Sequence, residues 1–145
     1  MAAANAWLLD LGDAMHAAIG MRELVQIIEA PITFAVPLTP AHSSNVMFWQ
    51  KRMVPVLDLS IRLDNKASKG KLMAIVGYHD AANQTAGLGA IILAAPPVRI
   101  AVDDAQACTL DEDMARWHEL ANSSFKQERE VIPVLHLSRL FGAAD

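Results

Sequence analysis

Residues Arg52–Leu63, RMVPVLDLSIRL, decide the fold, because most of this stretch occurs a second time near the end of the chain. Residues Ile132–Phe141 read IPVLHLSRLF, and aligned without a gap with Val54–Leu63 they are identical at five of ten positions. A proline, a valine, two leucines and a serine match in the same register. Chance similarity between two apolar strands is the alternative. The agreement favours a duplicated element, in which a strand that begins with proline leads into a short helical turn.

The rest of the chain consists of short apolar stretches separated by turn residues. Trp7–Leu11 and Ala14–Ile19 predict a hairpin, because Gly12 tolerates the positive φ of a tight turn. Nearby prolines limit Ile32–Val36 to an edge strand, and Met21–Glu29 reads as a helical turn running into a strand. The further strands expected are Val46–Trp49, Met53–Leu57, Leu72–Tyr78, Ala90–Ala94, Val98–Val102, Ala105–Leu110 and Glu130–Leu135. Many short strands at this spacing predict an all-β barrel or sandwich.

The repeat divides the chain into two similar parts. A chain of 145 residues forms one domain, here with two small subdomains at about 7–65 and 72–141 that share a core. If each half builds a small barrel closed by the repeated element, the sequence needs that element twice. Asp58 and His136 occupy the same place in the two copies. We expect Asp58 to cap the amides of the following turn, and His136 to do so less well.

One longer helix is expected in the second half. Thr109 and Glu112 have the spacing of a capping box, so Asp111–Leu120 predicts a short helix. Met114 and Trp117 would face inward from it.

The composition excludes several classes of function. Lys and Arg number 12 against 16 Asp and Glu, so no basic excess attracts phosphate backbones and no nucleic-acid partner is expected. The single cysteine, Cys108, rules out an intramolecular disulfide and a multi-cysteine metal site. With 53% hydrophobic and 19% charged residues, the chain has more apolar side chains than a small core usually uses. The excess indicates an exposed patch that meets another protein.

No stretch has the features of a signal peptide or a membrane span. The beginning, MAAANAWLLDLGD, lacks a basic segment, and Asp10 interrupts its apolar run. Gly87–Ala95 is far shorter than the roughly 20 residues that cross a bilayer, and Pro96-Pro97 is expected to end it. We therefore expect a cytoplasmic protein with no direct membrane insertion.

The residues that could carry chemistry show no catalytic or metal-binding pattern. The five histidines lack the H-x-H or H-E-x-x-H spacing of metal sites. His79-Asp80 point to opposite faces if they lie on a strand, and no nucleophile motif surrounds His42-Ser43-Ser44. Gly87-Leu88-Gly89 precedes a strand, whereas a dinucleotide-binding glycine motif follows one. We expect no enzyme, with no catalytic residue, no metal and no cofactor.

At several places the chain resembles the CheW-like domain of bacterial chemotaxis, the coupling protein that joins chemoreceptors to their histidine kinase. RMVPVLDLSIRL is similar to the family's V-P-V-x-D-L stretch, and VIPVLHLSRLF to its closing strand and helix. Residues 8–28, LLDLGDAMHAAIGMRELVQII, resemble its opening strand pair and V-x-x-I segment. Residues 87–110 resemble the strand pair that leads to its V-D-x-V-x-x-V-x-x-L pattern. The resemblance runs from about Trp7 to Phe141.

This resemblance implies two small fused five-stranded β-barrels, SH3-like and with short helical turns, around a shared core. It implies a non-enzymatic adaptor without a cofactor, in chemotaxis or a pilus-type chemosensory system. The regulatory domain of a CheA-like histidine kinase would bind apolar side chains of one barrel. A methyl-accepting chemotaxis receptor would bind near the family's V-x-x-I and N-L-R-G segments. The candidate protein-binding residues at the matching positions are Val25, Ile28, Asn45, Phe48, Trp49 and Gln50.

The candidate region departs from the family's pattern. Asn45–Lys51 stands where the family commonly reads G-V-I-N-L-R-G, so Gln50 replaces the arginine and Lys51 the last glycine. Ile27 stands at the acidic position of the family's V-x-E-I. An acid and an arginine that can face each other are therefore both missing, which leaves neither charge buried and unpaired. These changes predict a different or weakened receptor contact.

Two questions stay open at the level of sequence. Neighbours on a strand face opposite ways, so one of Phe48 and Trp49 can fill the barrel while the other forms an exposed anchor beside Val25 and Ile28. Alternatively, a bulge places both in the core. The second question is function, because a self-associating β-barrel module that has lost the kinase and the receptor would form a homo-oligomer with the same fold.

Overall fold

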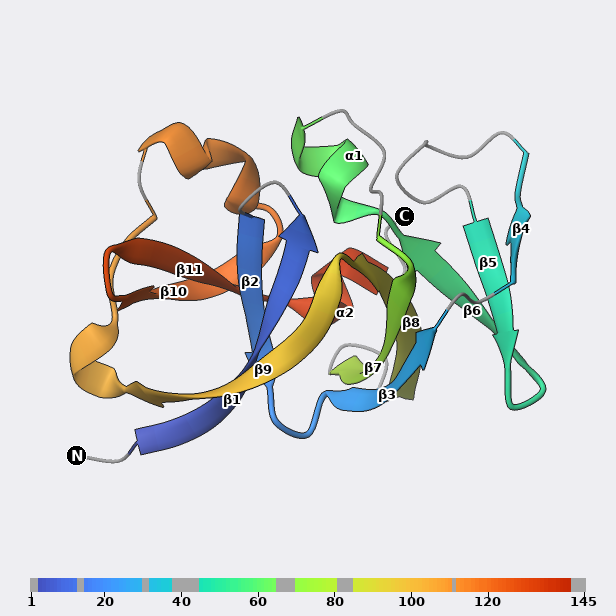
Figure 1. The fold of residues 1–145 in the computed structure, drawn as a ribbon, viewed down its shortest axis with the longest axis horizontal. Coiled ribbons are helices and arrows are strands. Elements are labelled where there is room, and N and C mark those ends of the chain that lie inside the picture. Colours follow the sequence, from blue (N-terminus) through green and yellow to red (C-terminus); the bar gives the residue numbers. More distant parts are fainter. Residues whose placement is uncertain are drawn as a thin grey trace.

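The computed structural model describes residues 3–12, 15–29, 32–37, 45–64, 70–80, 85–110 and 112–141, which form two curled β-sheets with a few short helices (Figure 1). The first sheet has the strand order β10-β11-β2-β1-β9, with bounds Ala121–Gln127, Glu130–Leu135, Met15–Gly20, Ala3–Gly12 and Ala95–Asp103. The second has the order β3-β7-β8-β6-β5-β4, with bounds Leu24–Glu29, Leu72–Asp80, Thr85–Leu93, Arg52–Leu57, Asn45–Trp49 and Thr33–Ala35. The all-β prediction is confirmed.

Both copies of the repeated sequence form the same element, a strand followed by a short helix. Strand β6 leads into α1, and β11 leads into α2, with bounds Leu59–Asp64 and Leu137–Phe141. Each strand makes the parallel contact of its sheet, through Val56 beside Ala90 in one and Val134 beside Ala18 in the other. The two valines are equivalent in the sequence repeat. The prediction of a duplicated closing element is confirmed.

The two halves of the chain exchange their first hairpins. The β1-β2 hairpin of the first half lies between β11 and β9 of the second half. The β7-β8 hairpin of the second half lies between β6 and β3 of the first half. Each sheet therefore takes strands from both stretches that the sequence suggested as subdomains, 7–65 and 72–141. These boundaries describe the two repeats, but they do not match the two sheets.

Each sheet is also brought back toward itself by the segment that follows an edge strand. After β9, Ala107 forms a bridge with Phe125 of β10, and the Cys108 amide donates to the carbonyl of Ser124 at 3.1 Å. After β3, the chain continues into β4, which pairs with β5 at the opposite edge of the second sheet. The result is two five-stranded barrels, as the family resemblance implied, with β4 as an additional strand in the second.

The core has three parts. The interior of the second barrel holds Met47, Val54, Val56, Met73, Ile75 and Ala90. The interior of the first is smaller and holds Ala18, Phe125 and Ile132. A larger shared cluster joins the exchanged hairpins to both helices, and it includes Leu9, Leu11, Ile19, Leu59, Val76, Ile91, Leu93, Trp117, Leu120, Leu135 and Leu137. Burial of an aliphatic side chain of this size contributes about 1.5–3 kcal/mol. The shared cluster therefore holds the two barrels together.

The segment after β9 differs from the expected strand at Ala105–Leu110. A 3-10 turn, η2, covers Asp104–Gln106, and only Ala107 forms a bridge. The Asp103 carboxylate accepts from the Ala105 amide at 2.8 Å, and the Gln106 side chain accepts from the Asp103 amide at 2.8 Å. This capping box competes with strand pairing, and so the strand prediction was wrong.

Other differences also come from positions where local patterns mislead. Pro96-Pro97 lies inside β9, because a strand at the sheet edge can lack amide donors. Strand β10 was not predicted, since its sequence ANSSFKQ is mostly polar. The helix expected at Asp111–Leu120 is a 3-10 segment, η3, at Glu112–Trp117. Its Trp117 is buried in the shared cluster, so the expected inward orientation is confirmed.

The shared cluster predicts that the two barrels unfold together. Leu59 and Leu137 hold equivalent positions in the repeat, and each is 1% exposed. We expect Leu59→Ala and Leu137→Ala each to lower the free energy of unfolding by about 2–5 kcal/mol, with a single transition in both variants. Urea unfolding followed by circular dichroism and by tryptophan fluorescence measures both quantities. Val98→Ala is the control, because Val98 is an exposed residue of β9. Separate unfolding transitions for the two barrels would contradict a shared core.

Candidate functional site

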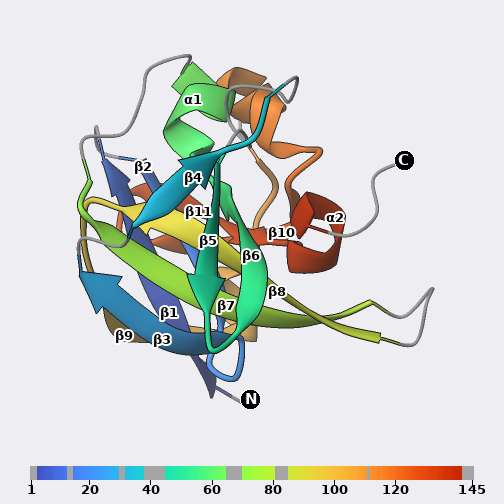
Figure 2. The ribbon, with the colours of Figure 1, turned by 90° about the vertical axis from the view of Figure 1, so that its right-hand side faces the viewer.

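An apolar surface covers the outside of β4, β5 and β6, three neighbouring strands of the second barrel that Figure 2 shows side by side. We call it the outer apolar face, and it consists of Ile32, Phe34, Val46, Phe48, Met53 and Pro55. Direct cross-strand partners bring Phe34 to Val46, Val46 to Pro55, and Phe48 to Met53. The side chains therefore form two adjoining rows across the sheet.

The outer apolar face is unusually exposed for its residue types. Ile32, Phe34, Phe48 and Met53 are 77%, 49%, 58% and 62% exposed, and they are four of the six large hydrophobic residues exposed in the described part of the chain. The rings of Phe34 and Phe48 meet edge to face, with centroids 5.8 Å apart. Exposed apolar side chains that are contiguous mark interaction surfaces more often than scattered ones do.

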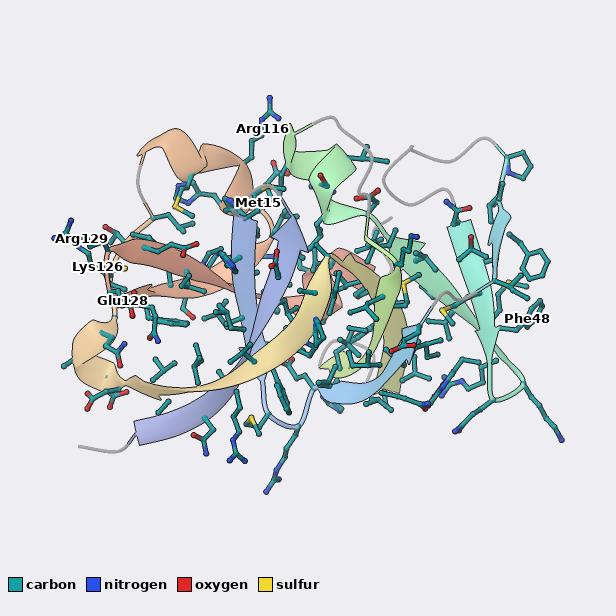
Figure 3. All side chains as sticks on the ribbon, in the orientation of Figure 1. Met15, Phe48, Arg116, Lys126, Glu128 and Arg129 are labelled. Atoms are coloured by element: carbon teal, nitrogen blue, oxygen red, sulfur yellow. The ribbon has the colours of Figure 1, made fainter. Side chains whose placement is uncertain are left out.

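Phe48 and Trp49 point in opposite directions. Phe48 projects away from the barrel (Figure 3), whereas Trp49 packs against the barrel interior. The Trp49 indole Nε1 donates to Oε1 of Gln26 on β3 at 3.1 Å, so it links two walls of the barrel near its rim. The two aromatic residues are therefore not both in the core, since Phe48 is exposed and Trp49 is packed.

The other candidate residues lie on the same barrel, with different surroundings. Val25 is half exposed on β3, at the point where pairing with β7 shifts register, and Ile28 packs against the barrel interior. Asn45 begins β5 opposite Val56, and Gln50 is exposed in the β5-β6 turn. The described neighbours of the Phe48 side chain are Phe34 and Met53, which the sequence analysis did not select. In the sequence, the signal for the outer apolar face was the apolar side chain at every second position, Ile32 and Phe34.

The β5-β6 turn has a backbone conformation that normally favours glycine. Gln50 and Lys51 have φ values of 49° and 66°, and Trp49 pairs directly with Arg52. Positive φ at both central residues is the geometry of a type I′ hairpin turn. Lys51 is the position where the CheW-like family has a glycine, so the chain retains the turn without the residue that suits it.

The junction between strand and helix differs between the two copies of the repeat. Asp58 is buried, and its Oδ1 accepts from the amides of Ser60 at 3.1 Å and Ile61 at 3.4 Å, as predicted for a cap. His136 instead forms a 3.0 Å contact between Nε2 and the Ser138 hydroxyl. Its buried Nδ1 has no partner among the described residues. The histidine therefore replaces the cap incompletely.

Among the residues that the structure describes, no group of three or more His, Cys, Asp or Glu side chains could hold a metal ion. No helix within the same residues is long and apolar enough to cross a bilayer.

The comparison with known proteins gives a fold but no sequence match. Profiles of protein families do not match the sequence, and a search of curated proteins found no significant relative. The structure is similar to the crystal structure of the scaffolding protein TtCheW from Thermoanaerobacter tengcongensis, with a TM-score of 0.72 and 15% sequence identity. The similarity covers 99% of this chain and 95% of that chain. The chain therefore has the fold of a CheW scaffold over its whole length.

The positive φ of Lys51 predicts a stabilising substitution at this site. We expect Lys51→Gly to raise the free energy of unfolding by about 0.5–1 kcal/mol, because glycine adopts without a Cβ clash the left-handed conformation that costs other residues about 1–2 kcal/mol. Urea unfolding measures the change. Arg129→Gly is the matched control, since Arg129 is the equivalent residue of the β10-β11 turn and its φ is not positive. Equal effects of the two substitutions would contradict this explanation.

Proposed function

We propose that this chain is a non-enzymatic adaptor of the CheW type, which joins a chemoreceptor to a CheA-type histidine kinase in the cytoplasm. The observation that carries the proposal is the similarity of fold to a CheW scaffold along the entire chain. The order of the sequence motifs, from the opening hairpin to the second proline-led strand, supports the same assignment. Chemotaxis and pilus-type chemosensory systems are both compatible outputs of such an adaptor.

The outer apolar face is the surface we assign to the kinase. It presents two aromatic rings on a rigid sheet, whose immobilisation costs little side-chain freedom, and beside them the flexible side chain of Met53, which can adapt to a partner. The partner would be the kinase's own CheW-like regulatory domain, whose barrel must expose a complementary apolar surface. Binding of the kinase to the outer apolar face would remove from water the apolar side chains that are not buried in the core of this protein.

The receptor contact is proposed to differ from that of the family. Ile27, at the usual acidic position, packs against the shared cluster, and Gln50 lies exposed in the turn. Where the family pattern has an acid, this chain has the packed side chain of Ile27. Where the pattern has an arginine, this chain has the neutral amide of Gln50. A receptor that relies on those two charges would bind this chain weakly, so its partner must be recognised through other groups.

The mechanism of such an adaptor is positional. It carries out no chemical step, and it acts by holding the kinase and the receptor in a fixed relative geometry. Differential binding of the adaptor to two receptor conformations would then shift the kinase between its states. A single shared core supports this role, because it prevents independent movement of the two barrels.

Retention of a kinase domain tests the proposal. The CheW-like regulatory domain of a CheA-type kinase from the same organism should retain the wild-type chain at concentrations of about tens of micromolar. Phe48→Ser should weaken that binding about tenfold or more, because it removes the central side chain of the outer apolar face. Val98→Ser is the control, since Val98 is equally exposed but lies on the first barrel. No retention of folded wild-type protein would remove the coupling role.

Self-association is the second candidate function, and the outer apolar face is the observation that favours it. Two copies could bury this surface against each other without a kinase. Light scattering of the wild-type chain and of Phe48→Ser separates the two functions. A stable homo-oligomer that dissociates in the variant, together with no kinase binding, would establish the self-associating module instead.

A further inference from the structure

The mouth of the second barrel contains a cavity of about 450 Å³. Its lining includes Arg22, Glu23, Arg52, Tyr78, His79 and Leu88, which come from the turn before β3 and from β6, β7 and β8. The mouths of β-barrels are frequent ligand sites, since the sheet holds the lining residues rigidly.

The Arg52 and His79 side chains continue the inward-facing rows of the barrel. Arg52 has the same strand parity as Val54 and Val56, whose side chains are buried in the barrel interior. On β7, His79 has the same parity as the buried residue Ile75. His79 lies opposite the small residue Ala86 of β8. The barrel interior is therefore apolar in its depth and cationic at this rim.

The charges of the mouth favour an anion. Arg22 and Arg52 are both exposed, and within the described residues neither forms an ion pair with a carboxylate. Among the described residues of the lining, Glu23 is the only acidic one. Its Oε1 is already occupied by the amide of Gly20 at 2.6 Å. The guanidinium groups of Arg22 and Arg52 and the imidazole of His79 therefore remain available to a ligand.

The floor of the mouth is apolar on the face of β7 and β8 that is turned toward the barrel interior. Leu88 supplies its apolar surface, next to Gly77, where an added Cβ would lie 3.4 Å from Val25. On the opposite face of the two strands, a Cβ on Gly87 would lie 2.3 Å from Cζ of Tyr78, so the Tyr78 ring covers that glycine. The Tyr78 ring is itself stacked on Phe141 of α2, with centroids 5.9 Å apart. A ligand that combines an apolar side chain with carboxylates fits this combination of floor and rim.

We propose that the mouth of the second barrel binds an acidic segment of a partner protein, with one apolar side chain over Leu88 and its carboxylates on Arg22 and Arg52. The inference rests on the proposed coupling function and gives the chemistry by which the second partner is recognised. It accounts for a receptor contact without the family's acid and arginine, because the cations here lie on different elements. An acidic peptide is favoured over a small anion because the cavity is larger than a single anion needs and much of its floor is apolar.

The experiment is a titration of the ¹⁵N-labelled full chain with blocked peptides, followed by amide chemical shifts. The peptide EELEELEE should shift the amides of Gly77 and Gly87 in a saturable manner, and the peptides QQLQQLQQ and KKLKKLKK should not. Raising the ionic strength from about 0.01 M to about 0.15 M should weaken the binding, because the Debye length falls from about 30 Å to about 8 Å. Sodium phosphate is the fourth ligand. Saturable shifts at these glycines with phosphate and none with the peptide would overturn the assignment to a peptide.

A charge-matched pair of variants locates the binding. Arg22→Glu with Arg52→Glu should weaken binding of EELEELEE about tenfold or more. Arg99→Glu with Arg129→Glu makes the same change in net charge at exposed positions outside the mouth, and it should have little effect. Equal weakening by the two pairs would show nonspecific attraction and overturn the proposal. Retention of the kinase domain should be unchanged by Arg22→Glu with Arg52→Glu, so failure of this inference is distinguishable from failure of the adaptor role.

Discussion

The structure depends on the parallel pairing of each proline-led strand with a hairpin from the other half of the chain. Val56 beside Ala90 and Val134 beside Ala18 are the two points where this pairing occurs. Both alanines lie in the barrel interiors, where a small side chain leaves room for the larger ones that fill a narrow barrel. Because the hairpins are exchanged, one face of each closes a barrel while the other contributes to the shared cluster. Each barrel takes strands from both repeats, and so the two repeats must fold as one unit.

Side chains alternate between the two faces of a strand, so the duplicated strands can keep similar buried residues and differ in their exposed residues. Val54 and Ile132 occupy equivalent buried positions of the two barrels, and so do Met47 and Phe125. On the outward face, the equivalent of Phe48 is Lys126, next to a turn that carries Glu128 and Arg129 (Figure 3). Packing constrains only the inward residues, since a change there alters the filling of a small barrel. One module can therefore present an apolar surface in one copy and a charged surface in the other.

The sequence predicted the parts of the fold that depend on local or repeated patterns. The repeat identified both closing strands, and turn residues identified the first hairpin. Exchange of the hairpins was out of reach, because it depends on pairing between residues distant in sequence. Strand β10 was missed since it buries few side chains, Ser124 and Phe125 among them, in a mostly polar sequence. At the candidate site, Phe48 was identified from its chain neighbours, but Phe34 and Met53 join it only through strand pairing. The mouth combines the turn before β3 with residues of β6, β7 and β8, so no motif signals it.

The two proposed binding surfaces use opposite faces of the same strand. On β6, Met53 and Pro55 face outward to the outer apolar face, whereas Arg52 reaches the mouth and is followed inward by Val54. Two partners bound at these places would be separated by one layer of a barrel whose interior holds buried apolar side chains in mutual contact. Close-packed interiors shift between discrete arrangements and do not deform continuously. A displacement of one partner would therefore be passed to the other with little loss, which is the property that a positional adaptor requires.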